Sequence, residues 1–318
     1  MATIKCLAQD IGDRYALYQG DCCEVVLGIP SASIGFSVFS PPFADLYCYS
    51  DNERDVGNSQ NYAEFFTHFQ FLAGELFRVM QPGRIVAVHC IDIPAMKERD
   101  GYIGLKDFPG DIIRMFQKAG FIYHSRHVIW KDPLIEATRT KALGLMHKQL
   151  CKDSAMSRAG LPDYVLGFRS PGENQLPISH PHGLSKYFGS KDPGGRGVQR
   201  QHNIWRAYAS PVWMDIRQTF TLNRDGAREE NDEKHVCPLQ IDLVERCMVL
   251  WSKEGDTVLT PFAGIGTEAV VALMNGRKAI AIELKSSYFR QAQKNIAAAL
   301  LPQNDQSDLF AAVASEQP

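Results

Sequence analysis

Residues 257–269 read Thr257-Val-Leu-Thr-Pro-Phe-Ala-Gly264-Ile-Gly266-Thr-Glu-Ala269, a short apolar run that passes through two glycines into a helix-forming segment. Glycines at this spacing allow the tight turn that brings a nucleotide-like ligand against backbone N–H groups and a helix N-terminus. Glu283 ends the next apolar run, where a carboxylate can accept hydrogen bonds from both hydroxyls of a ribose. The stretch therefore predicts a strand, a turn, a helix and a second strand that bind a nucleoside.

Two features distinguish this turn from a dinucleotide site, which the glycines alone would also fit. Pro261 and Phe262 precede the glycines and place an aromatic ring where it can cover a ligand. The unit also comes late in the sequence, and no second nucleotide-binding half follows it. We therefore expect a ligand with one nucleoside.

Apolar runs alternate with amphipathic segments along most of the chain. Strands are expected at residues 15–19, 34–39, 84–90, 121–130, 257–259 and 278–284, and helices at 22–28, 62–80, 107–119, 267–274 and 287–300. This alternation predicts an α/β protein with a doubly wound, mostly parallel, Rossmann-like sheet and helices on both faces. Residues 170–233 are rich in proline and glycine and predict a loop-rich insertion.

Composition excludes several classes of protein. The chain has 318 residues, of which 45% are hydrophobic and 22% charged, values typical of a globular protein rather than a disordered or fibrous one. No apolar run is long enough to span a membrane, and residues 1–10 do not resemble a secretory signal. None of the eight cysteines forms a Cys-x-x-Cys pair, so we expect no structural zinc site, and we expect reduced thiols in a cytoplasmic protein.

Positive charge is concentrated in one part of the chain. The formal net charge is −2, but residues 124–206 hold 13 lysines and arginines against six acidic residues. A basic segment in an acidic protein is the electrostatic pattern expected of a nucleic-acid contact. A solvated, lysine-rich surface would give the same pattern, and charge alone does not distinguish the two.

A second motif, Ser40-Pro41-Pro42-Phe43, directly follows the expected strand 34–39. Two prolines fix the backbone and remove two N–H donors, so the carbonyls of Ser40 and Pro41 become rigid acceptors. Two acceptors beside an aromatic ring suit an exocyclic amino group on a flat base, and fixed dipoles stabilise the positive charge that the nitrogen gains on methylation. By itself, the motif is equally compatible with a proline-rich strand exit that has no chemical role.

Together, these motifs resemble the amino-methylating DNA methyltransferases that use S-adenosylmethionine, in the β arrangement. In that family a Ser/Asp/Asn-Pro-Pro-aromatic motif comes first, a target-recognition region follows, and a Phe-x-Gly-x-Gly motif comes last. The same order occurs here, from residues 40–43 through the basic region to residues 262–267. Residues 233–240 and Gly20-Asp21 are similar to two further cofactor-contacting segments of the family. The resemblance covers roughly residues 15–169 and 233–300.

The resemblance implies a methyltransferase sheet with permuted motif order and an inserted recognition region. Residues 1–169 would form the catalytic half, with its basic part from about 131, and residues 170–232 the target-recognition insertion. Residues 233–301 would form the S-adenosylmethionine-binding half, and residues 302–318 a disordered tail.

The likeness also assigns roles to residues. A base flipped out of duplex DNA would stack on Phe43 and present its amino group to Ser40 and Pro41, held rigid by Pro42. The amino nitrogen would then take the methyl group directly, without a metal. The cofactor would contact the following residues: Asp21, Lys234, His235, Pro238, Thr260, Phe262, Gly264, Gly266, Thr267 and Glu283.

Two positions depart from the family pattern. Thr260 stands where Asp is usual, which removes one charged acceptor and puts one cofactor contact in doubt. Ser40 begins the first motif, and Ser is commoner in cytosine-N4 enzymes, whereas Asp or Asn is commoner in adenine-N6 enzymes. Both amino groups need the same acceptors, so the target base stays open between adenine N6 and cytosine N4.

The sequence also predicts binding partners for this protein. The DNA contacts are expected from five basic residues of the insertion, Lys186, Lys191, Arg196, Arg200 and Arg206. Gln306-Ser-Asp-Leu309-Phe310 resembles the peptide by which bacterial replication proteins bind the sliding clamp, although an idle tail would fit equally. We expect a homodimer, as in many members of this arrangement. Two other readings stay open: a DNA-binding homologue impaired in catalysis, for which Thr260 is the only hint, and a methyltransferase of RNA or a small amine.

Overall fold

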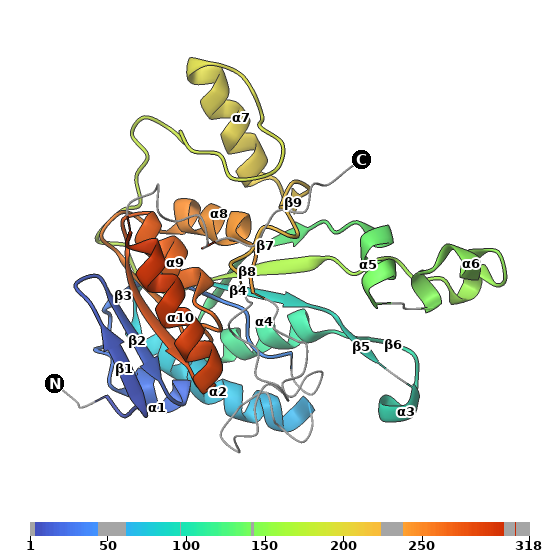
Figure 1. Ribbon diagram of the computed structural model, residues 1–318, viewed down its shortest axis with the longest axis horizontal. Helices are drawn as coiled ribbons and strands as arrows, with labels where there is room; N and C mark the ends of the chain where they lie inside the picture. The colour runs from blue at the N-terminus through green and yellow to red at the C-terminus, as the bar shows by residue number, and fades with distance from the viewer. Residues whose placement is uncertain are drawn as a thin grey trace.

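A nine-stranded mixed sheet, in the order β1-β2-β11-β10-β3-β4-β8-β7-β9, forms the centre of the computed structural model (Figure 1). The structure describes residues 4–43, 62–95, 97–140, 143–223, 238–301 and Leu309. The strands are β1 Ala8–Ile11, β2 Tyr15–Gln19, β3 Ile34–Phe39, β4 Met80–Ile91, β7 Ile122–Ile129, β8 Asp163–Arg169, β9 Val212–Trp213, β10 Thr257–Thr260 and β11 Lys278–Glu283. A small second sheet pairs β5 Ile93–Ala95 with β6 Gly104–Lys106.

Five neighbouring strands, β2, β11, β10, β3 and β4, run parallel. The two late strands β10 and β11 lie between β2 and β3, so the two ends of the sequence share one sheet. Because the strands are parallel, their carboxyl ends meet at one edge, which is where ligands bind in open α/β sheets. β8 runs antiparallel to β4, and its first residue therefore lies at the same edge.

Helices cover both faces of this sheet, as the sequence predicts for a doubly wound fold. They are α1 Cys22–Leu27, α2 Tyr62–Val79, α3 Lys97–Asp100, α4 Phe108–Lys118, α5 Pro133–Thr140, α6 His147–Leu150, α7 Gly197–Ala209, α8 Ile241–Trp251, α9 Thr267–Met274 and α10 Ser286–Ala299. Strand β4 shows the division, because Ile85 and Ala87 join the cluster of α8, α9 and α10, whereas Val86 and Val88 join that of α1, α2 and α4. Each face thus has its own apolar core.

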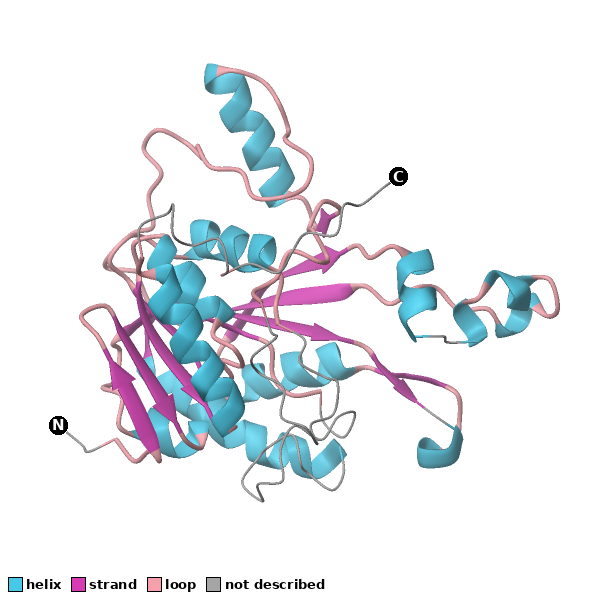
Figure 2. Cartoon of the chain, in the orientation of Figure 1, coloured by secondary structure: helices cyan, strands magenta, loops and turns pink. Residues whose placement is uncertain are grey.

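The insertion is more regular than the sequence predicts. Residues 170–232 were expected to be loop-rich, but they contain α7 and β9, and β9 pairs in parallel with β7 (Figure 2). The helix buries only Ile204 and Tyr208, so the sequence shows little hydrophobic periodicity. Gly194, Gly195 and Gly197 lie at its start and favour a loop in a sequence-based prediction. Strands β1 and β8 were also not predicted. Within the described ranges, the structure has no helix long and apolar enough to cross a membrane.

Candidate functional site

The two motifs meet at the carboxyl edge of the sheet. Ser40 follows β3 and Pro261 follows β10, and these strands pair side by side with Ser37 opposite Leu259. The Ser37 hydroxyl donates to the Leu259 carbonyl at 2.8 Å, which fixes the two strands against each other. Phe43 and Phe262 both pack against the same buried apolar cluster. The centre of the Phe262 ring lies 5.7 Å from the centre of the Phe39 ring, which belongs to this cluster. The motifs therefore border one site.

The turn after β10 needs both of its glycines. Gly264 and Gly266 have φ angles of 52° and 89°, in the left-handed region that side chains disfavour. A Cβ at Gly266 would also lie 3.2 Å from the Cβ of Ala292 on α10, whereas a Cβ at Gly264 would have no atom of the described residues within 4 Å. The lack of a side chain at Gly266 therefore allows the turn to pack closely against α10. The lack of a side chain at Gly264 keeps a methyl group out of the space in front of the turn.

Glu283 is held in place by the backbone. The N–H of Gly264 donates to its Oε2 at 2.8 Å, and the N–H of Lys285 donates to its Oε1 at 2.8 Å. These two bonds fix the orientation of the carboxylate, and a carboxylate oxygen can accept more than one hydrogen bond. Thr260 Oγ1 is buried and has no hydrogen-bond partner among the described residues, although buried polar atoms are normally paired. An acceptor and an orphaned hydroxyl beside the turn fit a polar nucleoside ligand.

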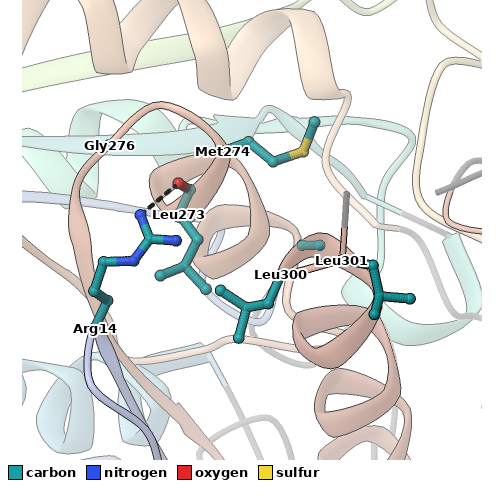
Figure 3. A pocket seen from close by; sticks show the side chains of 7 residues that line it. Arg14, Leu273, Met274, Gly276, Leu300 and Leu301 are labelled. Atoms are coloured by element: carbon teal, nitrogen blue, oxygen red, sulfur yellow. Dashed lines mark hydrogen bonds between the residues drawn. The ribbon is translucent and has the colours of Figure 1, made fainter. Parts of the chain in front are cut away.

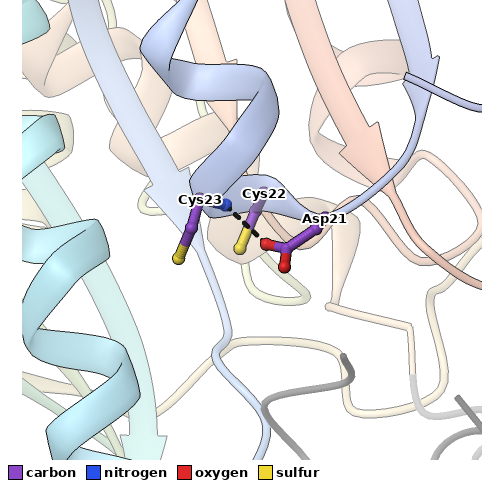
Figure 4. A group of neighbouring side chains, drawn as sticks. All are labelled: Asp21, Cys22 and Cys23. Carbon is purple, nitrogen blue, oxygen red and sulfur yellow. Dashed lines mark hydrogen bonds between the residues drawn. The ribbon is translucent and has the colours of Figure 1, made fainter. Parts of the chain in front are cut away.

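Asp21 lies at the same edge, after β2. The Gly20 N–H donates to the Glu283 carbonyl at 3.1 Å, and Asp21 Oδ1 accepts the Cys23 N–H at 2.8 Å as the N-cap of α1 (Figure 4). In the described part of the chain, Asp21, Cys22 and Cys23 are the one group with metal-ligand spacing. A hydrogen bond with Cys23, followed by burial, raises the pKa of the Cys22 thiol, which disfavours the thiolate that a metal needs.

A buried polar chain leads away from Ser40, and no motif in the sequence points to it. His89 on β4 has its Nδ1 3.0 Å from Ser40 Oγ and its Nε2 3.2 Å from Asp163 Oδ2. Lys131 forms an ion pair with the other oxygen of Asp163. Burial opposes ionisation of Asp163, but His89 and Lys131 outweigh it and hold its pKa below the ordinary value. The sequence signal was one histidine within the apolar run 85–91, and only the pairing of β4 with β8 places it beside Asp163.

Phe43 lies among aromatic rings that leave part of its surface free. Its ring centre is 6.5 Å from that of His89 and 6.2 Å from that of Phe108, which it meets edge-on. Phe43 itself is only partly buried. Part of the ring is therefore accessible to a flat ligand.

The basic residues of the insertion lie on or beside α7, which projects from the sheet (Figure 1). Lys186, Lys191, Arg196 and Arg206 are exposed or partly so, and Arg200 forms an ion pair with Asp192 at 2.9 Å. Trp205 is 61% exposed, whereas Trp213 is 1% exposed and belongs to the core.

Arg246 of α8 contacts several residues of this insertion. Its buried guanidinium pairs with Asp215 at 3.1 Å and lies 5.0 Å from the Trp213 ring centre. It also lies 4.9 Å from the ring centre of Tyr208 on α7. The insertion is thus attached to the half of the chain that holds the glycine turn.

Other predicted residues lie apart or outside the described ranges. Lys234, His235 and the tail peptide Gln306 to Phe310 fall outside them, except Leu309, whereas Pro238 is partly buried just before α8. A surface hollow at the opposite edge of the sheet, before β2 and β11, is unrelated to the motifs (Figure 3). It is lined by Arg14, Leu273, Met274, Gly276, Ala299, Leu300 and Leu301.

Comparison with known proteins identifies the family. The family model described as DNA methylase, N6_N4_Mtase, matches residues 34–294. The chain belongs to this N6/N4 DNA methylase family. It is therefore a DNA amino-methyltransferase with the expected α/β methyltransferase fold, and the family uses S-adenosylmethionine.

Individual relatives are distant but nearly full-length. The chain is 23% identical over 330 residues to the type II methyltransferase M.BglI of Bacillus subtilis, covering 92% of this methylase and 89% of that protein. A DNA modification methylase of Thermus thermophilus, TTHA0409, solved with S-adenosyl-L-methionine, superposes with a TM-score of 0.61 at 22% identity, covering 89% and 93% of the two chains. The cytosine-N4-specific PvuII DNA methyltransferase gives a TM-score of 0.57 at 17% identity, covering 92% and 88%.

Proposed function

We propose that the methylase transfers a methyl group from S-adenosylmethionine to the exocyclic amino group of a base flipped out of duplex DNA. The observation that carries the proposal is the meeting of the Ser40 motif and the glycine turn on adjacent parallel strands. Direct transfer requires that the methyl donor and the amino group lie nearly in contact, and positioning then supplies much of the catalysis.

The glycine turn is proposed to hold the cofactor. Glu283 would accept the ribose hydroxyls, and Phe262 would cover the adenine ring. Gly264, Gly266 and Thr267 would surround the methionine end together with Asp21, Lys234, His235 and Pro238. The orphaned Thr260 hydroxyl supports a polar ligand here, even without the usual aspartate. When bound, the cofactor supplies a methyl group already activated by its sulfonium.

The Ser40 motif is proposed to hold the target base. The sequence pattern indicates the Ser40 carbonyl as an acceptor, but the contact of Ser40 Oγ with His89 favours the side chain. The Ser40 hydroxyl and the Pro41 carbonyl would accept the two amino hydrogens, and Phe43 would stack on the ring. Pro42 keeps the turn rigid. As the nitrogen becomes cationic, these fixed acceptors stabilise the charge more than they stabilise the neutral base, which lowers the barrier. Flipping the base costs about a few kcal/mol in lost stacking.

Target recognition is assigned to the insertion. Lys186, Lys191, Arg196 and Arg206 would contact phosphates, and Arg200 would join them if its pair with Asp192 opens. M.BglI is a type II methyltransferase, and this supports a sequence-specific target for the present chain as well. A homodimer is also part of the proposal, and light scattering of the purified chain tests it.

Labelled methyl transfer tests the proposed function. Duplex DNA, single-stranded DNA and RNA are offered separately with methyl-labelled S-adenosylmethionine, and the products are digested and separated. We expect label in N6-methyladenine or N4-methylcytosine from duplex DNA, and the product names the target base. Label in RNA alone, or no transfer with cofactor bound, would contradict the proposal.

A further inference from the structure

We infer that His89 is a positioning residue that directs the Ser40 hydroxyl and receives its proton during methyl transfer. The inference rests on the proposed role of Ser40. Its basis is a buried chain of three side chains contributed by three different strands. Ser40 follows β3, His89 lies near the end of β4, and Asp163 begins β8.

The contacts define the direction of this chain. His89 is 7% exposed and Asp163 is 2% exposed, so water does not compete with their interactions. His89 Nδ1 lies 3.0 Å from Ser40 Oγ, and its Nε2 lies 3.2 Å from Asp163 Oδ2. Among the described residues, ion-pair contacts join the ring to Asp163 and join Asp163 to Lys131, which follows β7. The Phe43 ring lies on another side, with its centre 6.5 Å away.

Asp163 determines which ring nitrogen carries the proton. Although burial opposes ionisation of Asp163, its contacts with His89 and Lys131 lower its pKa, so the carboxylate is ionised and only accepts. In the uncharged form of His89, the negative charge of Asp163, whose Oδ2 lies 3.2 Å from Nε2 in a contact outside hydrogen-bond geometry, favours the hydrogen on Nε2 and leaves Nδ1 as an acceptor. Ser40 then donates its hydroxyl hydrogen to Nδ1 and turns its lone pairs toward the amino group of the base.

The same chain removes the excess proton. The amino nitrogen uses its lone pair to form the N–C bond, the S–C bond breaks and its electrons stay on sulfur. The nitrogen is left cationic and must lose one hydrogen. Ser40 Oγ accepts this proton while its own proton moves to His89 Nδ1. The imidazolium that results is stabilised by Asp163, in the way that a carboxylate supports the histidine of a Ser-His-Asp triad.

Substitutions of His89 separate the role of Nδ1 from simple packing. In His89→Gln the side-chain amide occupies the position of Nε2, and the contact with the Ser40 hydroxyl is lost. In His89→Asn the amide oxygen occupies the position of Nδ1. We expect the single-turnover rate of His89→Gln to fall about 100-fold, in the range of general-base effects. His89→Asn should retain more of the rate, because its amide oxygen can still accept from Ser40.

Three controls make the result specific. His127→Gln changes another buried histidine, which lies on β7 and bonds the Ser210 carbonyl, and its rate should stay within about 3-fold of wild type. The double variant Ser40→Ala/His89→Gln should be no slower than Ser40→Ala, because the two residues act as one unit. Cofactor affinity should be unchanged in all His89 variants. A wild-type rate in His89→Gln, or losses that multiply in the double variant, would overturn the inference.

Nitrogen-15 NMR of the His89 ring tests the tautomer without any catalysis. We expect an unprotonated Nδ1 whose resonance shifts in Ser40→Ala, and a protonated Nδ1 in the neutral ring would overturn the inference. If the tautomer is as expected but the wild type methylates no DNA, the proposed function fails and the assignment of the hydrogen-bonded chain stands.

Discussion

Ser40 and Glu283 are both acceptors, but the structure supports them in different ways. Ser40 is followed by two prolines and directed by His89, so its surroundings serve the orientation of a hydroxyl. Glu283 is held by the N–H groups of Gly264 and Lys285, so it is part of the turn itself. Changing the first should alter chemistry, and changing the second should alter binding.

The variants Ser40→Ala and Glu283→Ala test this difference. We expect Ser40→Ala to slow methyl transfer by about 100-fold or more with little change in the Kd for S-adenosylmethionine, because it loses one positioned acceptor. Glu283→Ala should weaken that Kd by about 10- to 100-fold, the loss of a charged hydrogen bond. Calorimetry and single-turnover rates measure the two effects. Equal losses of cofactor affinity in both variants would refute the assignment.

Glu268 predicts a pH dependence of stability. Burial raises its pKa to about 8, above the value of an exposed glutamate, so the folded protein binds its proton more tightly than the unfolded chain does. The stability contributed by that proton is full at acidic pH and is lost as pH rises toward about 8.

Glu268→Gln should remove this loss. Between about pH 5 and 8, its free energy of unfolding should fall less steeply than that of wild type, by about 1.4 kcal/mol per pH unit. Urea denaturation at several pH values measures the slopes. Parallel curves for the two proteins would show that Glu268 does not titrate in this range.

At the scale of elements, the turn between β10 and α9 combines packing with an open front. Gly266 would bring a Cβ to 3.2 Å from Ala292, whereas a Cβ at Gly264 would touch none of the residues that the structure describes. Both have positive φ angles, so both substitutions carry backbone strain of about 1–2 kcal/mol. Only the substitution at Gly266 adds a clash between α9 and α10.

Gly264→Ala and Gly266→Ala therefore form a matched pair. We expect Gly266→Ala to lower the free energy of unfolding more, by about 2–4 kcal/mol, since overpacking adds to the strain. Gly264→Ala should cost about 1–2 kcal/mol and should weaken cofactor binding, because the methyl group enters the open front. Denaturation with and without S-adenosylmethionine measures both. A greater loss of stability at Gly264 would contradict this division.

At the scale of the whole molecule, local pattern predicted elements better than their arrangement. The expected strands 15–19 and 34–39 and the helix 267–274 match the structure, because each is a short apolar or amphipathic run with clear ends. The insertion of β10 and β11 between β2 and β3 needs contacts across the sequence, and the motif order indicated it only through the family resemblance.

The site shows the same limit. Ser40, Phe262 and Glu283 belong to motifs with contiguous spacing, so the sequence could single them out. His89, Lys131 and Asp163 carry no motif, and they come together only because β8 runs antiparallel to β4 and β7. Their partners therefore could not be predicted from spacing.

One residue of the tail, Leu309, packs against the body of the protein, whereas the sequence predicts a disordered tail. Leu309 is 1% exposed and packs in the cluster of Leu222 and Leu239, and its carbonyl accepts the Asn223 N–H at 3.1 Å. The other tail residues, 302–308 and 310–318, lie outside the described ranges. A sliding clamp that binds Leu309 must therefore compete with the body of the methylase.

Deletion of residues 302–318 tests the clamp contact. We expect the truncated protein to lose its binding to a bacterial sliding clamp in a pull-down. Its Tm should be lower than that of wild type, and it should still transfer methyl groups at temperatures below that Tm. Leu309→Ala should lower the free energy of unfolding by about 2–5 kcal/mol, as for other buried leucines. Unchanged clamp affinity after the deletion would rule the contact out.

The central claim is that the Ser40 motif and the glycine turn form one site for methylating an amino group in DNA. Single-molecule sequencing of modified bases, in DNA from bacteria that express wild type or Ser40→Ala at equal levels, tests it most directly. We predict N6-methyladenine or N4-methylcytosine at one fixed sequence with wild type, and unmodified DNA with Ser40→Ala. Unmodified DNA with wild type, or the same modification with both proteins, would contradict the account.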